Sequence, residues 1–113
     1  MMSIKKKIFV AGGTGFLGKR IVARLAKEKI PYVASSLSRG VDFRNFDQLD
    51  KFFKKEKPDI VIDAAAFVGG IKFVGDHHGE VFFNNILISS HLIECARRAN
   101  VSLFINILSN CTY

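Results

Sequence analysis

Hydrophobic and polar positions change their period several times along the chain, and each change marks the end of a predicted element. Short apolar runs typical of buried strands occupy residues 8–11, 32–36, 60–62 and 102–108. Between them, apolar residues recur every three or four positions, which predicts helices over residues 16–29, 46–53 and about 80–99. Strands that alternate with helices form parallel βαβ units with right-handed crossovers, so we expect an α/β fold.

This order of elements predicts the first half of a Rossmann-like doubly wound parallel sheet with flanking helices. With strands numbered along the chain, the expected order in the sheet is 3-2-1-4, and the crevice opens between strands 1 and 4. We expect one domain over residues 1–113, truncated because the chain stops as the fourth strand ends.

The stretch from Ile8 to Gly18 places a buried strand, a glycine-rich loop and the start of a helix in direct succession. In such a loop Gly12 permits the tight turn, Gly15 lets a pyrophosphate approach the backbone, and Gly18 lets the helix lie close to the sheet. The unpaired N–H groups of the helix start then favour a phosphate. A plain structural turn is the alternative, but the succession favours a nucleotide-binding loop. Its residues are Gly12, Gly13, Thr14, Gly15, Phe16, Leu17 and Gly18.

Composition excludes several classes of protein. Apolar residues make up 49% of the 113 residues, which excludes disorder. The sequence has no long uninterrupted apolar stretch, so no membrane span is predicted. The basic start is followed by an apolar run that stops at Gly12, too short for a signal peptide, so we expect a cytoplasmic protein. Cys95 and Cys111 are expected to be free thiols, and the adjacent His77 and His78 to be surface residues, so no metal site is predicted.

The net charge of +7 allows nucleic-acid binding as a hypothesis, because lysines cluster at residues 5–7 and 51–57. No nucleic-acid motif accompanies these lysines. A solvated helix face and a basic sheet face that favours an anionic dinucleotide explain them better.

The end of the second strand bears on the choice of dinucleotide. Proteins that bind NAD usually place Asp or Glu there to bind the ribose 2′-OH. Here Ser35 and Ser36 occupy that position and Arg39 follows. Hydroxyls and a guanidinium can hold a 2′-phosphate, so we expect NADP rather than NAD, unless Arg39 is simply a loop cation.

The run A-G-G-T-G-F-L-G at residues 11–18 resembles the extended short-chain dehydrogenase/reductase family of NAD-dependent epimerases and dehydratases. The segments A-A-x-V-G-G-I at residues 65–71 and F-x-x-N-x-x-I at residues 82–88 look in particular like family members that epimerise and reduce GDP-4-keto-6-deoxymannose with NADPH. The resemblance covers nearly the whole chain. It implies a GDP-sugar substrate and a homodimer formed through the helix around residues 80–99.

The resemblance also implies roles for residues beyond the loop. Asp42 and Phe43 match the family's pair beside the adenine, and Asn85 would lie near the nicotinamide, unless it is an ordinary polar residue of a helix. Small residues at the end of the third strand would let the backbone approach the cofactor. They are Ala64, Ala65 and Ala66.

At the end of the fourth strand, Ser109 and Cys111 match the family's catalytic serine and epimerisation cysteine, although Leu108 and Asn110 depart from its pattern. The family's Tyr-x-x-x-Lys pair does not occur in these 113 residues, and Tyr113 is not that tyrosine. The resemblance thus implies a dinucleotide-binding domain over residues 1–113 from which the family's substrate domain is absent. We therefore expect the NADP(H)-binding part of such an enzyme, inactive as this chain alone. Alternatives are another sugar-nucleotide epimerase or dehydratase, a stand-alone dinucleotide-binding module without turnover, and a nonfunctional fragment.

Overall fold

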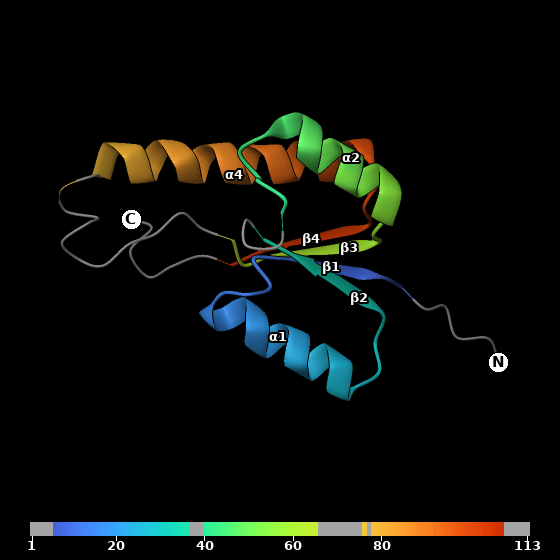
Figure 1. Cartoon of the computed structure of the whole chain (residues 1–113). Helices are drawn as coiled ribbons and strands as arrows, with labels where there is room; N and C mark the ends of the chain where they lie inside the picture. The colour runs from blue at the N-terminus through green and yellow to red at the C-terminus, as the bar shows by residue number, and fades with distance from the viewer. Residues whose placement is uncertain (1–5, 37–39, 66–75, 77, 108–113) are drawn as a thin grey trace.

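A sheet of four parallel strands separates one helix from two others in the computed structural model, which describes residues 6–36, 40–65, 76 and 78–107 (Figure 1). All the predicted strands and helices are present, with ends that differ from the prediction by a few residues. In chain order the elements are β1 (Ile8–Ala11), α1 (Phe16–Lys27), β2 (Tyr32–Ser35), α2 (Phe46–Glu56), β3 (Ile60–Asp63), α4 (His78–Arg98) and β4 (Leu103–Asn106).

The order of the strands in the sheet is β2-β1-β3-β4, so the expected order 3-2-1-4 is wrong. β1 pairs with β2 along one edge and with β3 along the other. Burial explains this arrangement: Phe9 and Val10 of β1 have no exposed surface, whereas Tyr32 of β2 is 37% exposed. A strand that is apolar on both faces belongs inside the sheet, and a strand with a half-polar face suits its edge.

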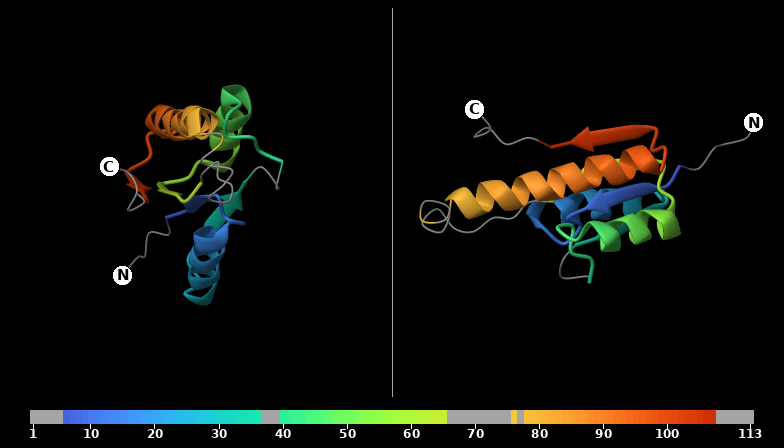
Figure 2. Two further views of the ribbon diagram at one scale, coloured as in Figure 1. Left: turned by 90° about the vertical axis from the view of Figure 1, so that its left-hand side faces the viewer. Right: turned by 90° about the horizontal axis from the view of Figure 1, so that it is seen from above.

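The helices divide between the two faces of the sheet, with α1 on one face and α2 and α4 on the other (Figure 2). Right-handed crossovers require this division, because the connection from β1 to β2 and the connection from β2 to β3 run in opposite directions. The neighbouring strands β1 and β3 therefore send the chain to opposite faces. The crevice of this Rossmann-like sheet lies at their carboxyl ends, not between the first and fourth strands as expected.

The hydrophobic core lies between the sheet and the pair α2 and α4. Phe9 of β1 is at its centre, with ring centroids 5.4 Å from Phe53 and 6.1 Å from Phe43, both in edge-to-face contact. The buried members of this core are Phe9, Ala11, Phe43, Leu49, Phe53, Val61, Ile88, Leu92, Cys95 and Ala96. This packing attaches α2 and the segment before it firmly to the sheet.

Cys95 is a buried free thiol, as the sequence predicts. Burial raises the pKa of this thiol to about 11, so the residue behaves as a small apolar side chain. Cys111 lies outside the described residues.

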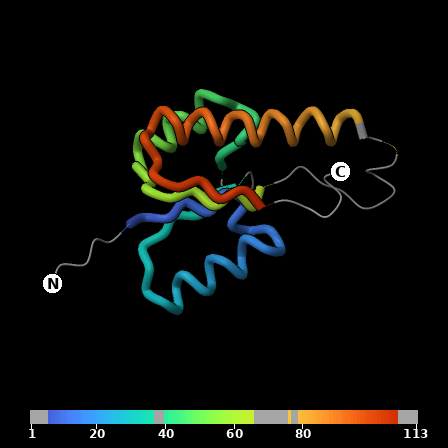
Figure 3. The backbone as a smooth tube through the Cα atoms, turned by 180° about the vertical axis from the view of Figure 1, so that it is seen from behind, coloured from blue at the N-terminus to red at the C-terminus, as the bar shows by residue number. Residues whose placement is uncertain are grey.

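Helix α4 is much longer than the strands that it covers. Its 21 residues span about 31 Å at 1.5 Å per residue, whereas a strand of four residues spans about 13 Å. The first half of α4 therefore projects past the carboxyl ends of the strands (Figures 1 and 3). There Phe82 is 67% exposed and Phe83 is 61% exposed, since no strand lies beneath them. No helix in the described part of the chain is both long and apolar enough to cross a membrane.

Candidate functional site

The loop after β1 begins with a glycine that the fold requires. Gly12 has φ +82°, a backbone conformation that favours glycine. A Cβ on Gly12 would also lie 2.7 Å from the carbonyl oxygen of Ala64, which follows β3. The Gly12 N–H donates to the carbonyl oxygen of Ser35 at 2.9 Å. This residue thus brings the ends of β1, β2 and β3 together, and the turn predicted at Gly12 is confirmed.

Gly13 and Gly18 are required by packing. A Cβ on Gly18 would lie 1.9 Å from the carbonyl oxygen of Gly12, and one on Gly13 would lie 2.5 Å from the Cβ of Ala34. Both distances are far below van der Waals contact. The first turn of α1 therefore rests directly on the loop, which confirms the close approach predicted for Gly18.

Gly15 differs from the other glycines of the loop. It has φ −76° and ψ 177°, which any residue can adopt. A Cβ at this position would meet only the Gly12 carbonyl oxygen, at an ordinary contact distance of 3.4 Å. Gly15 is exposed together with Thr14, Phe16 and Leu17. Nothing in the described fold requires glycine here, so the open space above Gly15 suits a molecule that approaches the backbone.

The start of α1 is electrostatically suited to an anion. Gly15 caps the helix without a side-chain hydrogen bond, and the first turn contains no acidic residue. The N–H groups of this turn and the positive end of the helix dipole therefore favour a negatively charged group.

The end of β2 lies beside the loop and presents hydroxyl groups. Ser36 Oγ is 2.9 Å from Thr14 Oγ1, a hydrogen-bonding distance. Ser35 is a member of β2 and is only 3% exposed. Ser36 is 9% exposed, and its hydroxyl contacts Thr14 of the loop. Arg39 lies outside the described residues.

Asp42 and Phe43 lie in the connection from β2 to α2. The Asp42 carboxylate accepts hydrogen bonds from the Arg44 side chain at 3.0 and 3.2 Å. These bonds hold the pKa of Asp42 below its ordinary value. Phe43 is buried beneath, and its carbonyl oxygen is 2.9 Å from Nδ1 of His91 in α4. The sequence analysis missed Arg44, although an opposite charge two residues after Asp42 was a usable signal.

Asp63 at the carboxyl end of β3 is a second residue that the sequence analysis missed. It is only 3% exposed, and its Oδ1 accepts the Ala65 N–H at 3.0 Å. The Ala64 N–H donates to the Ala11 carbonyl oxygen at 2.9 Å, so both alanines are fixed beside the glycine loop. Burial raises the pKa of Asp63, and the Ala65 N–H only partly opposes this. In the sequence, the position of Asp63 directly after an apolar run was a signal that could have identified it.

The remaining predicted residues are not all described. Asn85 lies half-buried in the first half of α4, next to Asn84, which contacts Arg44. Ala66, His77, Ser109 and Cys111 lie outside the described residues. Within the described ranges no group of three His, Cys, Asp or Glu side chains could hold a metal ion.

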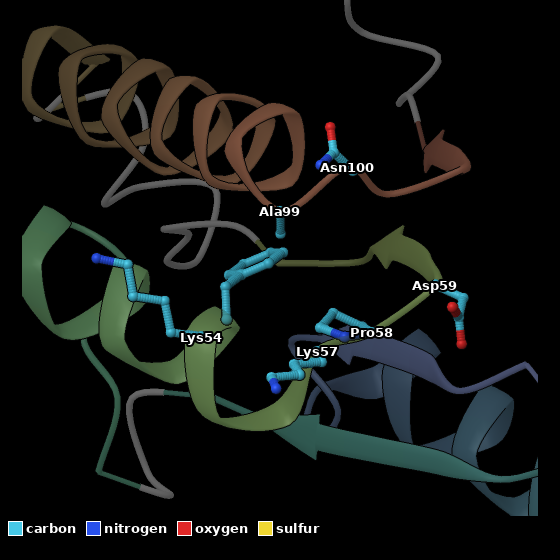
Figure 4. A pocket seen from close by; sticks show the side chains of 7 residues that line it. Lys54, Lys57, Pro58, Asp59, Ala99 and Asn100 are labelled. Carbon is cyan, nitrogen blue, oxygen red and sulfur yellow. The ribbon is translucent and has the colours of Figure 1, made fainter.

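A hollow lies near the amino ends of the strands, at the opposite end of the sheet from the glycine loop (Figure 4). It lies between the ends of α2 and α4 and beside the start of β3. Its lining residues are Phe53, Lys54, Lys57, Pro58, Asp59, Ala99 and Asn100. Since ligands of doubly wound sheets bind at the carboxyl ends of the strands, this hollow is not the candidate site.

The chain is similar in sequence to a family of known proteins. A model of the NAD dependent epimerase/dehydratase family matches residues 8–113. A GDP-L-fucose synthase of Sinorhizobium fredii is 32% identical over 108 residues, which are 96% of this chain and 34% of that protein. A GDP-mannose 3,5-epimerase of Oryza sativa subsp. indica is 30% identical over 125 residues, covering 98% of this chain and 32% of that protein.

Among solved structures, a GDP-L-fucose synthetase from Naegleria fowleri bound to NADP superposes with a TM-score of 0.77. It is 31% identical, and the match covers 97% of this chain and 32% of that one. This chain thus spans about a third of the length of the relatives that it matches.

Proposed function

Because the chain belongs to the NAD dependent epimerase/dehydratase family, we propose that its carboxyl edge binds a nicotinamide dinucleotide, NADP(H) in preference to NAD(H). The observation that carries this proposal is Gly15, an exposed glycine that neither backbone conformation nor packing requires. A pyrophosphate that lies against the backbone at the start of α1 accounts for a glycine at this position.

The surrounding elements support one orientation of the dinucleotide. The pyrophosphate would lie over Gly15 and the first N–H groups of α1, with the adenosine half toward the end of β2. The nicotinamide half would then extend toward the end of β3, where the small residues Ala64 and Ala65 leave the backbone accessible. Asp63 supports this segment through the Ala65 N–H.

The preference for NADP(H) follows from the hydroxyl groups at the end of β2. Ser36 and Thr14 can donate hydrogen bonds to a 2′-phosphate. Positions 35 and 36 are serines and not Asp or Glu, so no carboxylate at these positions repels the phosphate. Arg39 would add a positive charge. The NADP that is bound in the related Naegleria fowleri structure supports the same choice.

We propose further that the dinucleotide serves a sugar-nucleotide oxidoreductase and epimerase acting on a GDP-linked 4-keto-6-deoxy sugar. Ser109 would donate a hydrogen bond to the 4-keto oxygen, and the Cys111 thiol would exchange protons at the neighbouring carbons. The GDP-L-fucose synthase among the relatives supports this substrate class. The rice GDP-mannose 3,5-epimerase favours a second candidate, epimerisation without reduction. Neither activity is expected from these 113 residues alone, because they contain no Tyr-x-x-x-Lys pair to protonate an alkoxide.

Calorimetric titration of the chain with NADPH and with NADH tests the cofactor proposal. We expect NADPH to bind more tightly, by about 1.5–3 kcal/mol if one charge-assisted contact to the 2′-phosphate decides the difference. Arg39→Ala should reduce this preference while leaving NADH binding nearly unchanged. Equal affinities, or an NADPH preference that is fully retained in Arg39→Ala, would show that the assignment of the 2′-phosphate contact is wrong.

A further inference from the structure

The carboxylate of Asp42 is held by its neighbour Arg44 through three hydrogen bonds. Its Oδ1 accepts the backbone N–H of Arg44 at 3.0 Å and the Nε–H of Arg44 at 3.0 Å. Its Oδ2 accepts the Nη2–H of the same side chain at 3.2 Å. The guanidinium thus grips both oxygens, the planar arrangement that fixes a carboxylate most firmly.

This arrangement leaves one acceptor position that a ligand can use. A carboxylate offers about four lone-pair positions, two on each oxygen. Arg44 occupies both positions on Oδ1 and one on Oδ2, so the remaining position lies on Oδ2. The Asp42 side chain is 31% exposed, so solvent reaches part of this carboxylate.

The remaining position accepts a hydrogen bond but cannot donate one. Arg44 holds the pKa of Asp42 below its ordinary value, so the group is an ionised carboxylate at neutral pH. An amino group of a ligand is a matching donor. A carbonyl oxygen at the same place would face a negative charge and be repelled.

Arg44 is itself anchored to α4. Its Nη1–H donates to Asn84 Oδ1 at 3.2 Å, and Asn84 is only 9% exposed. The Asn84 amide donates in turn to the Glu80 carbonyl oxygen at 2.8 Å. The guanidinium therefore has partners on both sides, and the direction of the Asp42 carboxylate is set by α4 as well as by its own segment.

We propose that Arg44 is a positioning residue for nucleobase recognition, which aims Oδ2 of Asp42 at the 6-amino group of adenine. The proposal rests on the dinucleotide site proposed above. Asp42 has the right place for this contact, because its neighbour Val41 donates its N–H to the Ser36 carbonyl oxygen at 3.3 Å, directly after β2. The adenosine half of a dinucleotide lies at this end of a doubly wound sheet.

Calorimetric titration with NADPH and with its analogue that carries hypoxanthine in place of adenine tests the proposal. The two ligands differ at position 6, which carries an amino or an oxo group, and at N1, which carries a hydrogen only in hypoxanthine. We expect wild type to prefer NADPH by about tenfold or more, as for a charge-assisted hydrogen bond. Arg44→Gln should lose most of this preference, and Arg44→Lys should not restore it, because a lysine keeps the charge without the planar fork. Asp42→Asn should lose it as well.

Arg24→Gln is the matched control, since it removes the same charge from an exposed residue of α1 and should leave the preference unchanged. Thermal unfolding checks that each variant is folded. The ratio of the two affinities is the decisive quantity, because a purely structural role of Arg44 would weaken both ligands equally. A wild type without preference, or an Arg44→Gln variant that retains it in full, overturns the proposal. If neither dinucleotide binds to wild type, the dinucleotide site proposed above is wrong as well as the role of Arg44.

Discussion

Glycine is needed in the loop after β1 for different reasons at different positions, and this permits a test at the scale of single residues. A Cβ on Gly18 would lie 1.9 Å from a backbone oxygen, whereas a Cβ on Gly15 would lie 3.4 Å from its nearest described neighbour. We expect Gly18→Ala to lower stability by about 1–3 kcal/mol or more through overpacking. Gly15→Ala should cost only about 0.5–1 kcal/mol, the difference between glycine and alanine at a helix cap.

Gly15→Ala should weaken the binding of NADPH although it changes the stability of the fold only slightly. We expect Gly15→Ala to remain folded and to bind NADPH at least about tenfold more weakly, a loss of roughly 1.4 kcal/mol. Thermal unfolding and calorimetry on the same samples provide both numbers. If Gly15→Ala binds NADPH as tightly as wild type, the pyrophosphate does not lie against this residue.

Asp63 gives the protein a pH dependence of known sign. Burial raises the folded-state pKa of this carboxyl group above its unfolded value near 3.8, so the folded protein binds the proton more tightly. Its contribution to stability is therefore fully present below the unfolded pKa and is lost as the pH rises through the folded pKa.

Denaturant unfolding of wild type and Asp63→Asn between pH 3.5 and 7 measures this contribution, because asparagine keeps the acceptor but does not titrate. We expect the stability of wild type relative to Asp63→Asn to fall as the pH rises. A constant difference between the two proteins over this range would mean that the folded state does not raise the pKa of Asp63.

The sequence predicted those residues whose roles follow from local geometry. The spacing of Gly12 and Gly18 after an apolar run was sufficient to predict a tight turn and a close helix. Asp63 was missed because its role depends on burial, and Arg44 because one of its partners lies on a distant helix, although each residue also has a local signal in the sequence. The hydrogen bond from Arg44 to Asn84 joins residues 40 positions apart, and no local pattern indicates it.

At the scale of elements, α4 has apolar residues on more sides than the sheet can cover. The exposed members Phe82 and Phe83 lie on the half that projects beyond the strands, and Ile93 on the other half is 51% exposed. A helix that is apolar on several sides needs a further partner. We therefore expect the chain to be dimeric or aggregation-prone, in line with the homodimer that the family resemblance implies.

Light scattering over a dilution series tests this expectation. The double variant Phe82→Asp, Phe83→Asp should shift the chain toward monomer, and its stability should change little because both side chains are exposed. Leu103→Asp is the comparison variant, since Leu103 is 51% exposed on β4, the strand at the end of the sheet. A stable wild-type monomer at high concentration would show that neither surface drives association.

Periodicity predicted where each element lies but not how the strands are ordered. The apolar runs at β1 and β3 look alike in sequence, and nothing in their pattern says which strands they pair with. The order depends on the path of α2, which returns over β1 and places β3 on its far side. That path is set by which face each helix buries, a property of the whole sheet rather than of any segment.

At the scale of the whole molecule, the two ends of the sheet have different characters. The carboxyl end brings together the glycine loop, the hydroxyls of Thr14 and Ser36, and the Asp42–Arg44 pair. The opposite end has a hollow lined in part by Lys57 and Asn100. We propose that the dinucleotide binds at the carboxyl end alone.

Titration of isotope-labelled protein with NADPH, followed by the backbone amide signals in NMR spectra, tests this placement most directly. We expect the largest shifts at Gly13, Gly15 and Ser36, with no change at Lys57 or Asn100 at the other end. Shifts confined to the hollow, or a spectrum that NADPH leaves unchanged, would show that the dinucleotide does not bind at the carboxyl end of the sheet.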